Sequence, residues 1–205
     1  MVFLPTALTP RSVNRYKGGV EFILHYRGEL RPNGNATDKH RIRQWFHPQL
    51  KKLWEEPPLN DFRNDMLAPT TNPSSIIREL GAFQFAPLVS LKVSLLAELE
   101  ITLLRPGLPG SIVLHGGDID NRLKTLFDAL AVPSQSQALP QDAMPSAEES
   151  PFFCVLDDDR LITKVSIQTG RLLEDTTSAS EVELMVLVRT KKVPNEINVM
   201  GFEDI

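Results

Sequence analysis

The sequence predicts an α+β fold, in which a small mixed β-sheet is packed with helices. Several short segments alternate apolar and polar residues, the period-two pattern of half-buried strands. Two longer segments between them carry apolar residues at helical spacing. No Gly-rich loop with the spacing of a nucleotide-binding motif follows a predicted strand. We therefore expect an α+β arrangement and not a doubly wound one.

The strand pattern occurs at 20–26, 95–103, 161–167 and 182–188. In each segment apolar residues recur at every second position, with Thr163 the one polar residue in that series, which favours a strand with one face on the core. The second segment is the clearest, because Glu98, Glu100 and Thr102 alternate with its apolar residues. These four segments form most of the predicted sheet. Val89, Leu91 and Val93 either extend the second segment backwards or form a partner strand, and 112–114 is a candidate short strand.

The composition is that of one domain with a negative charge. The chain has 205 residues, 41% of them hydrophobic, which is enough to bury a core. Its net charge of −4 argues against a nucleic-acid coat protein, which is usually basic, but leaves room for a local basic face. We predict a lead-in at 1–18, one domain at 19–190 with a flexible insertion at about 132–151, and a tail at 191–205.

The sequence shows no membrane or secretory segment. Its first residues lack the basic start and the apolar run of a signal peptide. No window approaches the roughly 20 apolar residues of a membrane span. The single cysteine excludes an internal disulfide and suits a reducing compartment. We expect a cytoplasmic protein without a membrane partner.

A basic helical segment runs from 38 to 56. Pro48 lies inside it, so we expect a kink there or two short helices. By itself the pattern favours a solvated basic face, and the alternative is a phosphate-binding face, because the charge is dense and opposite to that of the chain. The candidate DNA-binding residues are Lys39, Arg41, Arg43, Lys51 and Lys52.

Two acidic clusters are the candidate site. Asp118 and Asp120 follow a Gly-Gly pair and precede a helical pattern, with Lys124 one turn into the helix. Asp157 and Asp158 precede a predicted strand. Carboxylates from different elements are the ligands that Mg²⁺ or Mn²⁺ prefers, and a lysine beside them can orient water or offset phosphate charge. The sequence therefore suggests a divalent-metal site for phosphodiester hydrolysis.

On spacing alone, a structural interpretation of these residues is somewhat favoured. Asp118 would be a loop acid, Asp120 an N-cap, Lys124 its i, i+4 partner, and the second cluster a turn. Asp128 continues the same helix face and is predicted to be structural. Cys154 is predicted to pack in the core, and the four histidines show no metal-ligand spacing, although His115 lies beside the acids.

The motifs favour the metal site over the structural interpretation, because they resemble those of a known family. The segment from Asp118 through Asn121 and Lys124 to Asp128-Ala129-Leu130 resembles the D-x-D-N-x-x-K…D-A-L motif of the RusA family of Holliday junction resolvases. The Leu156-Asp157-Asp158 turn before a strand resembles the family's second motif. Both motifs occur in the family's order, and the resemblance covers about residues 90 to 190. The insertion at 132–151 is a difference, since the family has a short link there.

The resemblance implies a small α/β-type domain with Mg²⁺-dependent nicking of branched DNA, with Mn²⁺ as a possible substitute. It implies that Asp118, Asp120 and Asp158 are catalytic, metal-binding carboxylates, with Asp157 as the fallback ligand, and that Lys124 is the essential lysine. It also implies a homodimer, because two sites must cut two symmetric strands.

The expected function is thus Holliday junction resolution in DNA recombination or repair. The alternative is a RusA-like DNA-binding or regulatory module with weak or no nuclease activity. A third hypothesis, a structural metal-binding protein, leaves Lys124 and the basic segment without a role.

Overall fold

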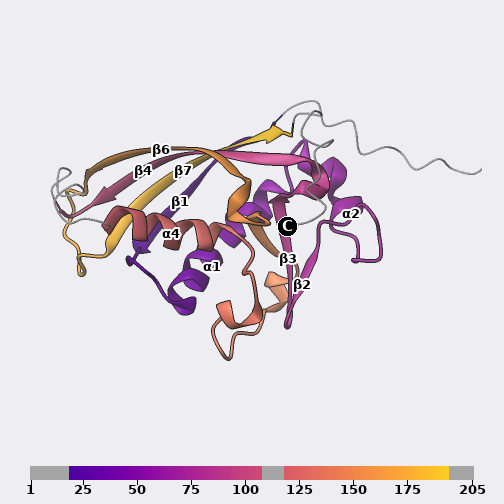
Figure 1. Cartoon of the computed structure of the whole chain (residues 1–205), viewed down its shortest axis with the longest axis horizontal. Coiled ribbons are helices and arrows are strands. Elements are labelled where there is room, and N and C mark those ends of the chain that lie inside the picture. Colours follow the sequence, from indigo (N-terminus) through magenta and orange to yellow (C-terminus); the bar gives the residue numbers. More distant parts are fainter. Residues whose placement is uncertain (1–18, 108–117, 194–205) are drawn as a thin grey trace, which may run out of the picture.

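The computed structural model describes residues 19–107 and 118–193 of the chain. They form two β-sheets and their helices, so the predicted α+β class is confirmed (Figure 1). The larger sheet has four strands in the order β1-β7-β4-β6, and the smaller has three in the order β2-β3-β5. None of the helices in the described ranges has the length and hydrophobicity that a membrane crossing requires.

The predicted strands form the larger sheet. β7 (Glu181–Lys192) pairs antiparallel with both β1 (Glu21–Glu29) and β4 (Leu95–Arg105), and β4 pairs parallel with β6 (Ile162–Arg171). Buried and half-buried residues alternate along all of β4, as its sequence pattern predicts. The buried side of β4 and β7 faces the core.

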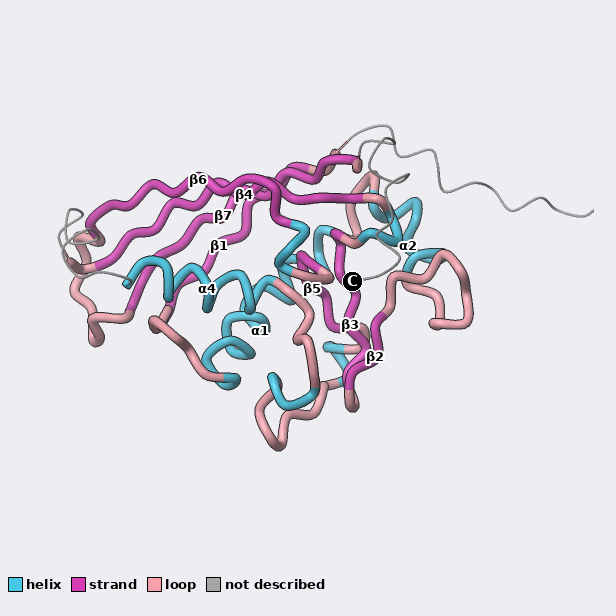
Figure 2. Tube along the Cα trace, in the orientation of Figure 1, coloured by secondary structure: helices cyan, strands magenta, loops and turns pink. Residues whose placement is uncertain are grey.

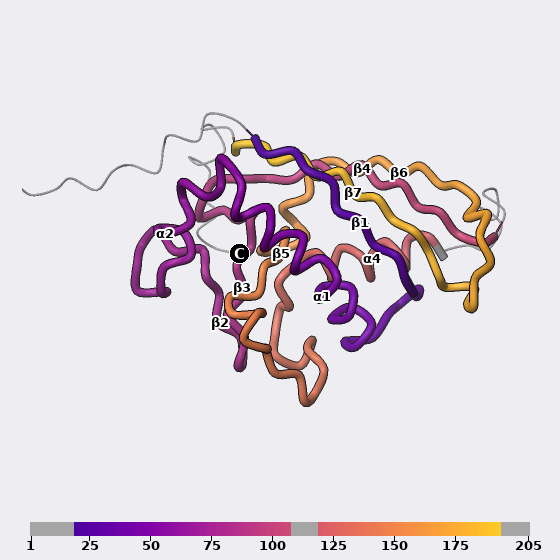
Figure 3. The backbone as a smooth tube through the Cα atoms, turned by 180° about the vertical axis from the view of Figure 1, so that it is seen from behind, coloured from indigo at the N-terminus to yellow at the C-terminus, as the bar shows by residue number. Residues whose placement is uncertain are grey.

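Helices cover one face of this sheet. Figures 2 and 3 show α1 (Ala36–Leu53) and α4 (Asp118–Leu130) on the same side of the four strands, and the other face carries no described helix. The Asn35 side chain accepts a hydrogen bond from the Asp38 backbone, and the Asp38 side chain accepts one from the Asn35 backbone. This capping box satisfies backbone donors that an uncapped helix start leaves free.

The predicted division into two short helices at Pro48 is wrong, because α1 runs through it as one helix, and the alternative of a kink at this proline stays a prediction. Proline lacks the N–H that would bond to the carbonyl of Gln44, four residues earlier. Both residues lie on the exposed side of α1, so water can satisfy that carbonyl. The buried side is continuous, with Ile42, Phe46 and Leu50 in the core.

The smaller sheet leads into the larger one. β2 (Arg78–Leu80) turns through Gly81, at φ +60°, into β3 (Phe83–Val89), and β3 pairs parallel with β5 (Phe152–Leu156). β3 continues through the 3₁₀ turn η2 (Leu91–Val93) into β4, and β5 continues through η5 (Asp159–Leu161) into β6. A pair of parallel strands thus leaves one sheet and enters the other side by side.

Short helical turns fill the connections. η1 (Leu59–Phe62) and α2 (Arg63–Met66) follow α1, and η3 (Ser136–Ala138) and η4 (Ala147–Glu149) lie in the predicted insertion. His47 of α1 forms hydrogen bonds with the chain at the end of the insertion. Its Nδ1 accepts from Phe153 N–H (2.9 Å), so Nε2 carries the proton and donates to Glu148 O (3.0 Å).

The two edges of the larger sheet differ. At the β1 edge, His25 N–H donates to Gln49 Oε1 (3.0 Å), and His25 O accepts from Gln49 Nε2 (2.8 Å) and Trp45 Nε1 (2.9 Å). Side chains of α1 therefore occupy this edge at His25. Among the described residues, no side chain or strand bonds to the outer edge of β6.

Candidate functional site

α4 presents a narrow polar stripe beside its buried face. Thr125, Leu126 and Ala129 are buried, whereas Asp120 and Lys124, one turn apart, are exposed. Among the residues that the structure describes, neither has an ion-pair partner. The side chain of Asp118, the whole of His115 and the candidate strand at 112–114 lie outside the described residues.

The loop after β5 lies where the paired strands change sheets. Asp157 N–H donates to Val89 O at the end of β3 (2.9 Å). The Asp157 carboxylate accepts from Arg78 Nη1 (2.6 Å) and Ser90 Oγ (3.1 Å). These contacts join the crossover from β5 to the crossover from β3, so Asp157 has a structural role in this arrangement.

The next two acids are in opposite electrostatic situations. Asp158 accepts from Arg160 N–H (2.9 Å), Nε (3.0 Å) and Nη2 (3.1 Å), and these Arg160 contacts hold its pKa below the usual range. The pKa of Asp159 is raised, first by burial and then by the charges of Asp158 and Asp128. The Asp159 carboxylate is therefore repelled by acids of both its own loop and α4.

The loop meets α4 at Asp128, near the end of the helix. Asp128, predicted from sequence to be structural, bonds through its carboxylate to Lys39 Nζ (2.7 Å). Asp120 lies eight residues earlier, roughly 12 Å along the helix axis. No described contact joins Asp120 to Asp158. The i, i+4 spacing of residues 120, 124 and 128 indicated from the sequence that Asp128 shares a helix face with Asp120. The proximity of Asp159 to Asp128 depends on how the strands cross between the sheets, and no sequence pattern predicts it.

The donor chemistry fits a hard divalent cation, but the described carboxylates do not form a complete site. Crowded carboxylates are the setting in which a cation is favourable, because it offsets their repulsion. Within residues 19–107 and 118–193, no group of three His, Cys, Asp or Glu side chains could hold a metal ion. The predicted ligand set includes Asp118, whose side chain falls outside that search.

The predicted DNA-binding role of Arg43 is wrong. Arg43 is only 2% exposed, and it donates to Asp128 O (Nη2, 2.7 Å) and Ala131 O (Nε, 3.2 Å) at the end of α4. Its guanidinium offsets the negative end of that helix and cannot contact phosphate. The helical spacing of the basic residues did not reveal that this position turns inward.

The other four basic residues of α1 are paired with acids. Lys39 pairs with Asp128, as described above, and Lys51 with Glu148 of the insertion. Arg41 pairs with Asp38 (3.1 Å), and Lys52 with Glu55 (3.0 Å). Each pair lowers the positive potential that the sequence suggested for this face.

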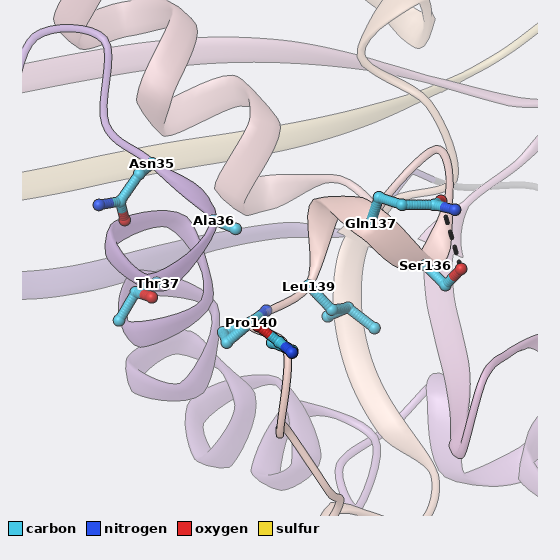
Figure 4. A pocket seen from close by; sticks show the side chains of 8 residues that line it. Asn35, Ala36, Thr37, Ser136, Gln137, Leu139 and Pro140 are labelled. Atoms are coloured by element: carbon cyan, nitrogen blue, oxygen red, sulfur yellow. Dashed lines mark hydrogen bonds between the residues drawn. The ribbon is translucent and has the colours of Figure 1, made fainter.

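A cavity of about 630 Å³ opens beside the first turn of α1 (Figure 4). One side is formed by Asn35 and Thr37, and the other by Ser136, Gln137 and Gln141 of the insertion. The lining is uncharged and rich in amides and hydroxyls. The sequence did not predict this cavity, because its two sides are about a hundred residues apart and neither carries a motif.

The three histidines in the described ranges and the cysteine are mainly structural. His40 and His47 pack against Phe152, with ring centroids 5.8 and 4.7 Å apart, and burial lowers the pKa of both. His25 pairs with Glu183 on the open face of the sheet. Burial raises the pKa of the Cys154 thiol to about 12, as suits a packed residue and not a nucleophile.

Comparisons of this chain with models of protein families, with curated proteins and with solved structures found no match.

Proposed function

We propose that this protein is a Mg²⁺-dependent, structure-specific endonuclease that nicks branched DNA, as in Holliday junction resolution. The observation that carries the proposal is the meeting of two acidic elements, the Asp157–Asp159 loop and helix α4, with the pKa of Asp159 raised in part by Asp128. These are the two elements that carry the motifs resembling the RusA family.

Asp118, Asp120 and Asp158 are the proposed metal ligands. A bound Mg²⁺ would supply charge stabilisation to the phosphate and lower the pKa of a bound water. In this proposal the chain would supply carboxylates from two elements, Asp118 and Asp120 from α4 and Asp158 from the crossover loop. The Arg160 contacts keep Asp158 ionised, which is the state a ligand needs.

Lys124 is the proposed residue that acts on the phosphate. It is exposed on the same helix face as Asp120, roughly 6 Å along the axis from it. Among described residues it has no carboxylate partner, so its ammonium is available to a phosphate oxygen. In this respect it differs from Lys39, which Asp128 holds.

A second candidate function is a DNA-binding or regulatory module without cleavage. Two observations favour it. Arg160 occupies both carboxylate oxygens of Asp158, and Arg78 with Ser90 occupies those of Asp157. If these pairs persist in the presence of metal, neither Asp157 nor Asp158 has a carboxylate oxygen free to bind it.

Cleavage assays on labelled DNA separate the two functions. The substrates are a four-way junction, a flap, linear duplex and single strand, each with Mg²⁺ or EDTA. We expect paired nicks on the junction, which EDTA abolishes and Asp120→Asn or Lys124→Ala reduces at least a hundredfold. Asp65→Asn, an exposed acid on α2, is the matched control and should cleave normally. Binding without cleavage, also in Mn²⁺, would support the second candidate.

Thermal denaturation with and without Mg²⁺ tests the ligands independently of cleavage. We expect Mg²⁺ to raise the melting temperature of the parent but not of Asp120→Asn or Asp158→Asn. Arg160→Ala should preserve or increase the Mg²⁺ effect, because it frees the Asp158 oxygens. A loss of the effect in Arg160→Ala would contradict Asp158 as a ligand.

A further inference from the structure

β6 is a long strand at an open edge of the larger sheet. It has 10 residues, and every residue from Thr163 to Gln168 is exposed. Val165 and Ile167 lie opposite Leu99 and Ile101 of β4, so they face the side of the sheet that the helices cover. They are nevertheless 40% and 37% exposed. Apolar side chains at an open edge favour pairing with another strand.

The two edge strands of the larger sheet differ in whether side chains bond to their outer backbone. Gln49 and Trp45 bond to the backbone of His25 on the β1 edge, as described above. The contacts described for β6 all lie on its β4 side, including the Thr163 hydroxyl, which donates to Ala97 O (3.1 Å). The described part of the fold therefore protects one edge and leaves the other available.

The sequence of β6 is complementary to itself. When two copies of the strand run antiparallel about Ser166, Thr163 lies opposite Thr169, Lys164 opposite Gln168, and Val165 opposite Ile167. β-branched residues meet on one face, and the lysine meets an amide and not its own copy. Such cross-strand pairs stabilise antiparallel sheets, whereas like charges opposite one another destabilise them.

We propose that β6 is a homodimer interface, in which it pairs antiparallel with β6 of a second copy about Ser166. The two larger sheets then form one continuous sheet. The two-fold axis is perpendicular to this sheet, so the interface is isologous and the helices of both copies lie on the same face. A single strand pair is smaller than a standard interface, so we expect a dimer that dissociates on dilution.

Disulfide trapping tests the register in the full-length protein. In Ser166→Cys the two introduced thiols lie directly opposite, within the Cα separation that a disulfide allows. In Gln168→Cys, the matched control on the same strand and face, the thiols are four residues apart, roughly 14 Å. The native Cys154 is buried and does not compete.

Mild oxidation should convert most of Ser166→Cys to covalent dimer and leave Gln168→Cys monomeric. A mixture of Lys164→Cys and Gln168→Cys should crosslink as a heterodimer. Equal crosslinking of Ser166→Cys and Gln168→Cys, or none in Ser166→Cys, would overturn the proposal.

Sedimentation of charge variants gives an independent test. Val165→Glu and Ile167→Lys should each weaken the dimer at least tenfold, because each puts a charge opposite an apolar residue. The double variant should regain dimerisation, since in this register each introduced acid lies opposite an introduced lysine. A monomeric parent at about 100 µM, or a double variant no better than the singles, would contradict the interface. Neither result depends on nuclease activity.

Discussion

At the scale of single residues, the buried polar groups beside α4 carry the most specific roles. Arg43 brings a cation from α1 to two carbonyls, that of Asp128 in the last turn of α4 and that of Ala131 just beyond it. The bonds to Asp128 O and Ala131 O also fix where the chain leaves α4 for the insertion. One side chain thus joins the basic helix to the acidic one from inside the core.

Replacing Arg43 should therefore affect stability. We expect Arg43→Ala to lower the free energy of unfolding by about 2–4 kcal/mol, because it leaves buried carbonyls unpaired and a cavity. Arg41→Ala removes a half-exposed guanidinium whose partner Asp38 also pairs with Arg31, so it should cost less than about 1 kcal/mol. Urea denaturation followed by circular dichroism measures both values. Similar losses in the two variants would show that Arg43 is not buried as described.

His40 should make the fold sensitive to acid. Its ring is buried against Phe83 and Phe152, and Nδ1 has no hydrogen-bond partner among the residues that the structure describes. Burial, followed by the Arg43 charge, lowers the pKa of His40 from 6.5 to about 4. The unfolded chain therefore binds a proton at a higher pH than the native state does. Stability is fully present above about pH 6.5 and falls as the pH drops towards 4, by about 3 kcal/mol.

His40→Leu should remove this contribution. Unfolding free energies measured at pH 7, 5.5 and 4.5 should decline less steeply in the variant than in the parent. Some decline should persist, because the pKa of His47 is also lowered. Identical slopes in the two proteins would contradict the assignment to His40.

At the scale of elements, the loop before α1 packs tightly against α4. Gly34 N–H donates to Thr125 Oγ1 (2.9 Å), and a Cβ at Gly34 would lie 2.7 Å from Thr125 Cγ2. We expect Gly34→Ala to destabilise the protein by about 1–3 kcal/mol, because two elements must move apart.

Thr125→Ser provides the matched relief, since it removes Cγ2 and keeps the hydroxyl that accepts from Gly34. In a double-mutant cycle of unfolding free energies, Gly34→Ala combined with Thr125→Ser should be less destabilised than the sum of the single variants, with a coupling of about 1 kcal/mol. If the two changes in unfolding free energy simply add, the strain at Gly34→Ala does not come from Thr125 Cγ2.

The elements also show what sequence periodicity can and cannot predict. β4 lies in the middle of the sheet with helices on one side, so its alternation of apolar and polar residues matches its burial. β6 has similar alternation, yet its central residues are exposed on both faces. Periodicity indicates a strand but not its position in the sheet, because strand order depends on contacts between distant segments. The same limit explains why the prediction for Arg43 was wrong. The local pattern could not show that this side chain is buried against the carbonyls at the end of α4.

At the scale of the whole molecule, the candidate site follows from the way the two sheets are connected. The sequence predicted the acidic loop and the acidic helix as separate motifs. It could not predict that the loop reaches α4 at Asp128. That contact requires the parallel strands β3 and β5 to pass from the smaller sheet to the larger one together, joined where they end by the Asp157 N–H to Val89 O bond. The cavity beside Asn35 is equally a product of tertiary structure.

The capped β1 edge has a consequence for assembly. Growth of a β-structure requires a free edge at each end, and a sheet with two free edges can add copies without limit. Here Gln49 and Trp45 occupy the backbone of His25 on one edge, and pairing through β6 uses the other edge in both copies. Both outer edges of the joined sheet are then β1 strands, whose backbone is occupied by α1 at His25. Self-association through this sheet should stop at two copies, and an aggregation-prone edge becomes a closed assembly.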